Sequence, residues 1–498
     1  MKKLSVIYHS SVRIHPSFFR YACGVFACGV FWLDYPRALY FGVATPLGYN
    51  ALPTRPIRFA TGERRTMPRR PQLAELMRRM EPRSVAIICS APETTRSNDT
   101  EYRYRQDSDF YYLTGCHEPE TIAVVAPGAE QDKYTLFVRP RDPEREAWEG
   151  RRAGVEGAVA EYGADAAFDI KEFKEKLGEI INGARNVYYR LGAHAELDRL
   201  LVRQIGLMRL RSRLFRAPEA ITDPGVLLHE MRLLKSKEEI AIMQQSADVA
   251  VEAHTEAMRQ ARPGMFEYEI EALIEYVFRR RGASAPAYTT IIGGGANATV
   301  LHYVANDSQL RDGDLLLIDA GAEYQGYASD ITRTFPVNGR FTTAQRAVYE
   351  VVLETQLACV EMVKPGVTME ELNRRATAML TAGMVRLGLL AGDVEKLIEE
   401  KTYKKFYMHT IGHFLGMDVH DVGSYQTGDG QSRPLAAGII LTIEPGLYIA
   451  ADAESVPDQY RGIGIRIEDD VLVTAGGHQV LTSKVPKEIE EIEKLMAR

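Results

Sequence analysis

The chain has 498 residues, of which 45% are apolar and 26% are charged, the balance of an ordinary globular protein. This composition excludes a wholly disordered chain, a collagen-like chain and a membrane protein with many spans. The formal net charge is only -6, and no block of five like charges occurs. We therefore expect neither nucleic acid nor a membrane as a partner.

The first 66 residues differ from the rest in how their charged and apolar residues are arranged. A short run without charge, residues 21–33, follows several basic residues, which is the order of a secretory signal, but no small-residue cleavage site follows closely. We expect residues 1–66 to be a poorly ordered extension or a start-site artefact, with a targeting role as the alternative. The odd cysteine count and the lack of a CxxC pair argue against a disulfide framework and favour a reducing, cytoplasmic compartment. The cysteines are Cys23, Cys28, Cys89, Cys116 and Cys359.

Residues 67–225 alternate short apolar strands with helices, which predicts an α/β domain. Pro218 and the Asp223-Pro224-Gly225 turn predict a linker over residues 217–225. Ser236 and Glu239 form a capping box that opens a long helix of the next domain, residues 226–498. The expected strands of the first domain are 85–89, 121–126, 134–138 and 187–189, and its expected helices include 171–181 and 195–207.

The second domain contains an internal repeat. Arg262-Pro263-Gly264 and Lys364-Pro365-Gly366 each stand between two helical patterns, and strands follow each pair. Such a long period is typical of a duplicated half-domain rather than a solenoid. Two halves related by a pseudo-twofold axis would place a site at their junction.

Four short segments carry the candidate chemistry. Asp319 ends a buried apolar run, and Asp330 follows it across an expected hairpin. If Tyr324 and Gln325 form the turn, the two carboxylates lie directly opposite one another. Repulsion between them would then require a cation. The alternative, in which one caps a turn and the other faces solvent, leaves an unpaired charge at the end of a buried strand.

Histidines and two further acids lie downstream. Glu444 and Glu468 each end another apolar strand, and four of the eleven histidines lie in the same part of the chain. Four carboxylates and one imidazole make a hard, oxygen-rich site that suits two divalent ions, such as Mn²⁺ with Co²⁺ or Zn²⁺ as substitutes. A hydroxide shared by the two ions could attack a polarised carbonyl, so we expect metal-assisted hydrolysis. The histidines are His302, His409, His413 and His420.

Several segments resemble a known superfamily. The stretches HYVANDSQLRDGDLLLIDAGAEYQGYASDITRTFPVNG, MHTIGHFLGMDVHDVG, LTIEPGLYI and GIGIRIEDD are similar to the metal-binding blocks of the methionine aminopeptidase, prolidase and aminopeptidase P superfamily, which has the pita-bread fold. The upstream stretches TRSNDTEYRYRQDSDFYYLTG and HEMRLLKSKEEI resemble bacterial aminopeptidase P. The resemblance covers residues 67–498 and does not reach 1–66.

The resemblance implies a complete set of metal ligands. By motif, Asp319 would bind one metal, Asp330 and Glu468 would bridge both, and His413 and Glu444 would bind the second.

The other three histidines match residues that contact substrate in the family. His302, His409 and His420 would stabilise the tetrahedral intermediate. Glu444 is the best candidate to accept the proton from the bridging hydroxide.

The implied function is removal of the N-terminal residue from peptides with proline in second position, by a homo-oligomer that is typically a tetramer. Prolidase, which cleaves Xaa-Pro dipeptides only, is the alternative within the superfamily. Creatinase shares the fold but lacks the ligand set. A nonenzymatic peptide-binding module is the alternative from another class, and a phosphate-binding loop at Gly293–Gly295 lacks the Lys-Ser/Thr of a P-loop.

Overall fold

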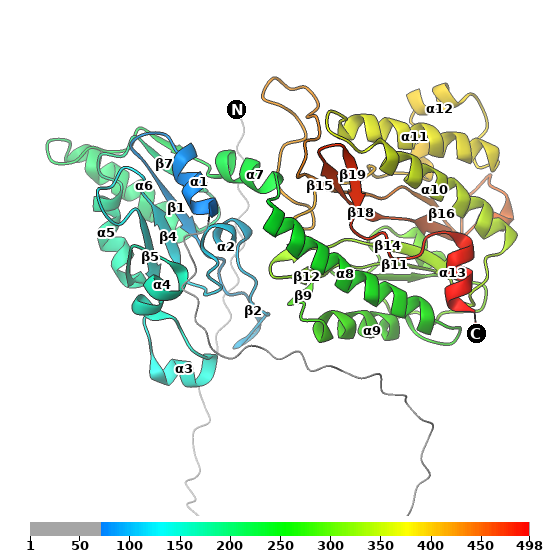
Figure 1. Ribbon diagram of the computed structural model, residues 1–498, viewed down its shortest axis with the longest axis horizontal. Helices are drawn as coiled ribbons and strands as arrows, with labels where there is room; N and C mark the ends of the chain where they lie inside the picture. Colours follow the sequence, from blue (N-terminus) through cyan, green and yellow to red (C-terminus); the bar gives the residue numbers. More distant parts are fainter. Residues whose placement is uncertain (1–70, 498) are drawn as a thin grey trace, which may run out of the picture. The chain divides into compact units, whose positions relative to one another are not determined.

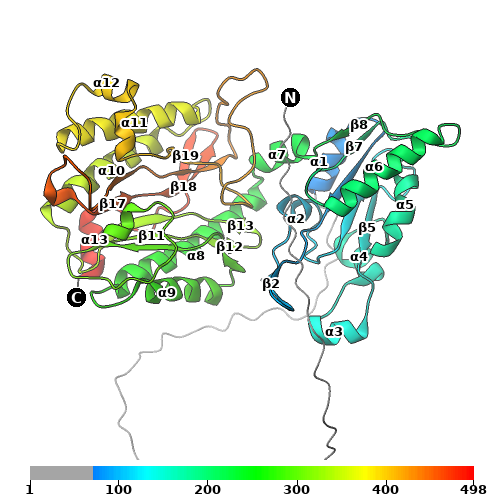
Figure 2. The ribbon, with the colours of Figure 1, turned by 180° about the vertical axis from the view of Figure 1, so that it is seen from behind.

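The computed structural model describes residues 71–497 (Figure 1). The predicted extension, residues 1–66, lies outside the described residues. An α/β region comes first along the chain, followed by a larger region that is also built from helices and strands (Figure 2).

The first region is built on a six-stranded mixed sheet with the strand order β6-β5-β4-β1-β7-β8. β4 is antiparallel to both of its neighbours, and the outer pairs are parallel. The strands are β1 (Ser84–Cys89), β4 (Ile122–Val125), β5 (Tyr134–Val138), β6 (Ala166–Asp169), β7 (Asn186–Tyr188) and β8 (Ala220–Thr222), with a separate hairpin of β2 (Thr95–Ser97) and β3 (Thr100–Glu101). The helices are α1 (Pro71–Arg79), α2 (Ser108–Thr114), α3 (Pro143–Glu149), α4 (Gly154–Tyr162), α5 (Phe173–Ile180), α6 (Ala195–Leu210) and the 3₁₀ turn η1 (Ile170–Glu172).

Alternation along the strands explains why helices cover both faces of this sheet. On β1, Val85 and Ile87 join the core formed with α5 and α6. Ala86 and Ile88 point to the opposite face and join the core formed with α1 and α2. Both faces are therefore apolar, as expected for a sheet buried between helices.

The predicted strands of this region are present with ends shifted by a residue or two. The predicted linker is partly wrong, because residues 220–222 form β8, the edge strand beside β7. Pro224 then precedes α7 (Gly225–Leu233) directly. The apolar Ile221 pairs with Val187 and overrides the turn residues on either side of it.

The second region packs helices around several small antiparallel sheets. Its sheets have the orders β10-β11-β14, β13-β12-β9, β15-β18-β19 and β16-β17. The helices are α7, α8 (Lys237–Gln260), α9 (Glu267–Arg280), α10 (Thr343–Met362), α11 (Met369–Arg386), α12 (Val394–Glu399), α13 (Ile489–Met496) and the 3₁₀ turns η2 (Gly295–Thr299), η3 (Thr402–Lys405) and η4 (Asp458–Tyr460). The strands are β9 (Ala285–Pro286), β10 (Ile291–Gly294), β11 (Leu315–Asp319), β12 (Ala322–Tyr324), β13 (Tyr327–Ala328), β14 (Thr332–Pro336), β15 (Ile440–Ile443), β16 (Gly446–Ile449), β17 (Ile463–Arg466), β18 (Asp469–Thr474) and β19 (Gly477–Val480).

The internal repeat is visible as two matched helix pairs, α8–α9 and α10–α11, each followed by strands. Gly264 and Gly366 end the two tripeptides with φ of 94° and 93°, a conformation that glycine adopts readily. The Gly264 amide donates to the Leu310 carbonyl, and the Gly366 amide donates to the Leu435 carbonyl. Each leucine lies in the part of the same half that carries the strands. The capping box predicted at Ser236 opens α8.

The hairpin that carries the two aspartates has a different register from the predicted one. Tyr324 pairs with Tyr327, so Gln325 and Gly326 form the turn, both with positive φ. A two-residue turn of this kind favours glycine at its second position, which moves the turn one residue along the chain. Asp319 consequently pairs with Thr332 and not with Asp330.

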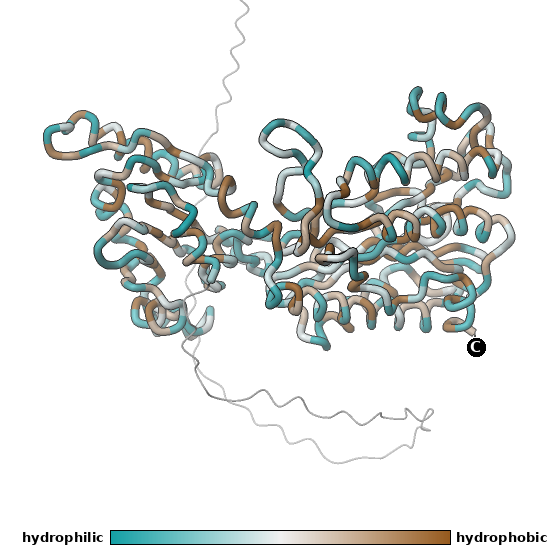
Figure 3. The backbone as a smooth tube through the Cα atoms, turned by 45° about the horizontal axis from the view of Figure 1, so that its top comes forward, coloured by the Kyte–Doolittle hydropathy of each residue, from teal (hydrophilic) through white to brown (hydrophobic). Residues whose placement is uncertain are grey.

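Hydrophobic and hydrophilic segments alternate along the helices of the second region, as expected for helices with one buried face (Figure 3). Within residues 71–497, no helix combines the length and apolar character needed to cross a bilayer. Gly293, part of the segment considered above as an alternative phosphate loop, lies within β10, and a Cβ there would crowd the backbone of η2.

Candidate metal centre

Strand ends bring the five predicted ligands to one place. Asp319 is the last residue of β11, Asp330 follows β13, Glu444 follows β15, and Glu468 follows β17. His413 lies in the segment that approaches β15, where its amide donates to the Thr442 hydroxyl. All five side chains line a single cavity of about 450 Å³.

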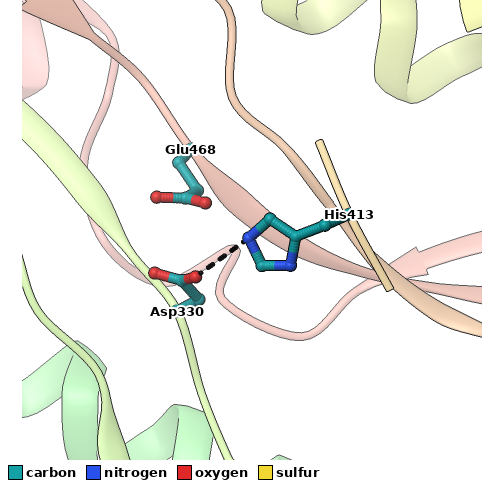
Figure 4. A group of neighbouring side chains, drawn as sticks. All are labelled: Asp330, His413 and Glu468. Atoms are coloured by element: carbon teal, nitrogen blue, oxygen red, sulfur yellow. Dashed lines mark ion pairs between the residues drawn. The ribbon is translucent and has the colours of Figure 1, made fainter. Parts of the chain in front are cut away.

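Three of these side chains converge most closely. One potential ligand atom from each of Asp330, His413 and Glu468 lies within 4.8 Å of the others (Figure 4). His413 Nε2 is 3.4 Å from Asp330 Oδ2 and 3.7 Å from Glu444 Oε1. An imidazole nitrogen and several carboxylate oxygens therefore face the same small volume.

Asp319 joins this group through shared partners. The Tyr288 hydroxyl is 2.6 Å from Asp319 Oδ1 and also contacts Asp330 Oδ1. Arg466 Nη2 donates to Asp319 Oδ2 at 2.5 Å. On the other side, the Thr332 hydroxyl donates to Glu468 Oε2 at 2.6 Å. Hydrogen bonds from the Tyr288 and Thr332 hydroxyls and from the Arg466 guanidinium thus orient these carboxylates.

The electrostatics of the site favour a bound cation. Burial raises the pKa of Asp330 and Glu468 above the ordinary carboxyl range, and it raises the pKa of Glu444 to about 7. Burial alone would lower the pKa of His413, but the adjacent Asp330 carboxylate outweighs it and raises the pKa to about 9. Crowded carboxylates that resist ionisation are stabilised when divalent cations take the place of protons. With oxygen and imidazole donors and no cysteine among the described residues lining the cavity, the set fits hard divalent ions.

The three remaining histidines line the same cavity, so all eight predicted site residues are brought together. The rings of His413 and His420 meet edge to face, with centroids 4.5 Å apart. His409 Nδ1 is 2.8 Å from the Thr410 carbonyl, and its Nε2 is 2.9 Å from the Tyr448 hydroxyl. Burial lowers the pKa of His409 to about 4, so this imidazole is neutral near pH 7.

The sequence reasoning missed three residues of the site. Arg466 lies two positions before Glu468 at the end of β17, and the alternation of side chains along a strand could have indicated that both point the same way. Arg466 Nη1 also donates to Tyr448 at 2.9 Å, which links Asp319 to His409 through two side chains. Tyr288 stands in a loop far upstream of either aspartate, and no local pattern marks it.

Two glycines allow the ligand-bearing segments to cross closely. A Cβ at Gly321 would overlap the carbonyl oxygen of Ser329, next to Asp330. A Cβ at Gly412, next to His413, would overlap the carbonyl oxygen of Thr442. Each glycine therefore sets the distance between two ligand-bearing backbones without offering a functional group itself.

Comparison with known proteins shows the family of this chain. The model of metallopeptidase family M24 matches residues 241–475, and the model of the aminopeptidase P N-terminal domain matches residues 69–188. The Xaa-Pro aminopeptidase of Escherichia coli K12 is 48% identical over 84% of this chain and 95% of its own length. The chain belongs to the aminopeptidase P branch of metallopeptidase family M24. The Xaa-Pro aminopeptidase of Haemophilus influenzae is 45% identical over 84% of this chain and 94% of its own length.

Solved structures of the same family share the architecture. An aminopeptidase of Pseudomonas aeruginosa matches with a TM-score of 0.84 at 50% identity, covering 86% of this chain and 96% of its own. Aminopeptidase P from E. coli, solved with the inhibitor Pro-Leu, matches with a TM-score of 0.82 at 47% identity, covering 85% and 96% of the two chains. The predicted family, its pita-bread fold with a preceding α/β domain, and the predicted class of metal-dependent aminopeptidase are confirmed.

Proposed function

We propose that this chain hydrolyses the bond between the first residue and proline in peptides of the form Xaa-Pro-Yaa. The observation that carries the proposal is the convergence of all eight predicted site residues on one cavity. Relatives that span nearly the same length are named for this activity. The inhibitor in the E. coli structure, Pro-Leu, begins with proline, as does the product left after the first residue of such a peptide is removed.

We propose that five side chains hold two divalent ions, preferably Mn²⁺. Asp319 would hold one ion, His413 and Glu444 the other, and Asp330 and Glu468 would reach both. Three of these already place ligand atoms within 4.8 Å of one another. When bound, two such ions polarise a carbonyl and lower the pKa of a water molecule.

Side chains of the protein would carry out the proton transfers and stabilise the oxyanion. Glu444 has its Oε1 toward His413 and its Oε2 3.9 Å from His409 Nδ1, so its two oxygens face different sides of the site. The oxygen away from His413 can accept the proton of the attacking water. His302, His409 and His420 surround the space left for the substrate and can donate to the developing oxyanion. His409 does so once its Nδ1–H leaves the Thr410 carbonyl.

Proline in second position makes this chemistry distinctive. The scissile nitrogen of an Xaa-Pro bond is tertiary and carries no N–H, and the proline ring fixes φ. A site that recognises its substrate by accepting a hydrogen bond from that N–H would fail here. A cavity lined with several imidazoles can instead supply a proton to the leaving imide nitrogen.

Four finer features are part of the same proposal. The domain boundaries are placed at 67–225 and 226–498, close to the two family matches. A cytoplasmic location is supported by the free state of the three cysteines within the described residues. A homotetramer is expected from the family resemblance alone. The α/β domain would help to shape the mouth of the active site.

The deciding experiment compares three peptides with the full-length, Mn²⁺-loaded protein. Ala-Pro-Ala should lose only its first residue, Ala-Ala-Ala should stay intact, and chelation with subsequent removal of metal should stop the cleavage. Cleavage of Ala-Pro but not of Ala-Pro-Ala would indicate prolidase instead. Binding of Ala-Pro-Ala without hydrolysis by the metal-loaded protein would indicate a peptide-binding module.

A further inference from the structure

A buried group of charged side chains lies outside the metal centre, where α2, α7 and the segment after His413 meet. Arg232 on α7 is at its centre and is only 3% exposed. Its Nη1 donates to Asp109 at 2.8 Å, and its Nη2 donates to Asp418 at 2.7 Å and to Asp421 at 2.6 Å. Lys235 Nζ donates to the other oxygen of Asp421 at 2.9 Å. We call these five residues the Arg232 cluster.

The Arg232 cluster holds both sides of a candidate catalytic residue. Asp418 and Asp421 flank His420 in the chain, and the segment between Phe414 and β15 contains neither a helix nor a named strand. His420 is exposed, and no hydrogen bond from the described residues 71–497 reaches its ring. Its ring lies against that of His413. The position of the imidazole is therefore set by its backbone, and the backbone is anchored by the two aspartates.

Other contacts tighten the same loop. Arg105 Nη2 donates to the Met417 carbonyl at 2.8 Å, and the Ser108 hydroxyl donates to Asp418 at 2.7 Å. A Cβ at Gly416 would overlap Asp421 Oδ2, so the chain folds directly onto this carboxylate. The loop is thus tied both to α7 and to the residues at the start of α2.

We propose that Arg232 and Lys235 are positioning residues that fix His420 over the metal centre, and that α2 supports them through Asp109. This inference rests on the proposed function, because it presupposes that His420 contacts the substrate. The planar fork of Arg232 holds Asp109 from Nη1 and Asp418 and Asp421 from Nη2. A lysine ammonium has all its donors on one nitrogen, so it does not reproduce this geometry. Burial alone would raise the pKa of Asp109, but its contacts with His229 and Arg232 outweigh this and hold the pKa below the usual range. The Asp109 carboxylate, which supports Arg232 from α2, therefore stays ionised.

The test is a double-mutant cycle in the full-length, metal-loaded enzyme. The variants are Arg232→Lys, His420→Ala and the combination of the two. Arg190→Lys is the matched control, since Arg190 Nη2 contacts Asp109 at 2.5 Å and has no contact with Asp418 or Asp421 among the described residues. We measure kcat and KM on an Xaa-Pro-Yaa peptide, together with metal content and the unfolding midpoint.

Arg232→Lys should lower kcat about 10- to 100-fold with KM changed less than about twofold, because a small displacement of a catalytic group has effects of this size. In the His420→Ala background the same substitution should cost less than about twofold, and Arg190→Lys should leave kcat unchanged. Equal losses in both backgrounds, or no loss from Arg232→Lys alone, would overturn the inference.

A second variant keeps the inference falsifiable if Arg232→Lys does not fold. Asp418→Asn is nearly isosteric and lies at the more exposed edge of the cluster, with a side chain 34% exposed. It should show the same loss of kcat and the same non-additivity with His420→Ala, and an additive result would overturn the inference. A wild-type kcat in His420→Ala itself would instead contradict the proposed function.

Discussion

Replacing His409 with alanine tests the division between metal ligands and substrate-contacting histidines. The ring contacts the Thr410 carbonyl and the Tyr448 hydroxyl. Two hydrogen bonds of about 0.5–1.5 kcal/mol each amount to about 1–3 kcal/mol of stability, so the variant should remain folded. Loss of one donor to the transition state typically costs about 10²–10³ in kcat, or about 2.7–4 kcal/mol. We therefore expect a folded enzyme with its full complement of metal and a kcat lowered by this factor.

The matched comparison is His413→Ala. His413 lies in the close group with Asp330 and Glu468, whereas His409 does not. Loss of a ligand should empty at least one metal position, so metal analysis separates the two variants even if both are inactive. Steady-state kinetics on an Xaa-Pro-Yaa peptide and metal stoichiometry after dialysis provide the two readouts. A His409→Ala enzyme that purifies without metal, or a His413→Ala enzyme that retains all of it, would refute the assignment.

Three further predictions follow from the site and its surroundings. Asp330→Asn should abolish activity and loosen metal while leaving the circular dichroism spectrum unchanged, since it removes the charge of the proposed bridging ligand; unchanged kcat and metal content would contradict this. Arg333→Met should lower the free energy of unfolding by about 1.5–3 kcal/mol in urea titrations. It removes one of the two cationic partners of the buried Asp469 carboxylate, at 2.7 Å, and leaves the other, Lys487. An unchanged midpoint would argue against a stabilising pair. Deletion of residues 1–66 should leave specific activity and the oligomeric state nearly unchanged. An inactive or monomeric product, where the full-length protein is an active oligomer, would show that the extension is needed.

The strand-ending acids illustrate what local pattern can predict. Asp319, Glu444 and Glu468 each close an apolar run, and a charge at the end of a buried strand is costly unless something compensates it. That argument predicts a cation from the sequence alone, and the structure places all three side chains in one cavity. Their roles as individual ligands stay predictions, which the substitutions above address.

The features that local pattern missed depend on register and on long-range contacts. The turn at Gln325 and Gly326 differs from the predicted one by a single residue, since the preference for positive φ outweighs the position of the carboxylates. The strand β8 could not be predicted from its own residues, which favour turns, because its stability comes from pairing with β7. Tyr288 could not have been predicted, because a loop tyrosine becomes part of the site only when the chain folds back on β11.

The close backbone crossings at Gly321 and Gly412 have a consequence for evolution in the laboratory. In a saturation library selected for peptidase activity, both positions should tolerate no other amino acid, although neither side chain takes part in the reaction. The barrier is steric, since any Cβ would push one ligand-bearing segment away from another. In such a library, the selection against substitutions at these two glycines would therefore be as strong as the selection at the ligand carboxylates. Attempts to redesign the pocket for other substrates should keep these two glycines fixed and vary the residues that only line the cavity.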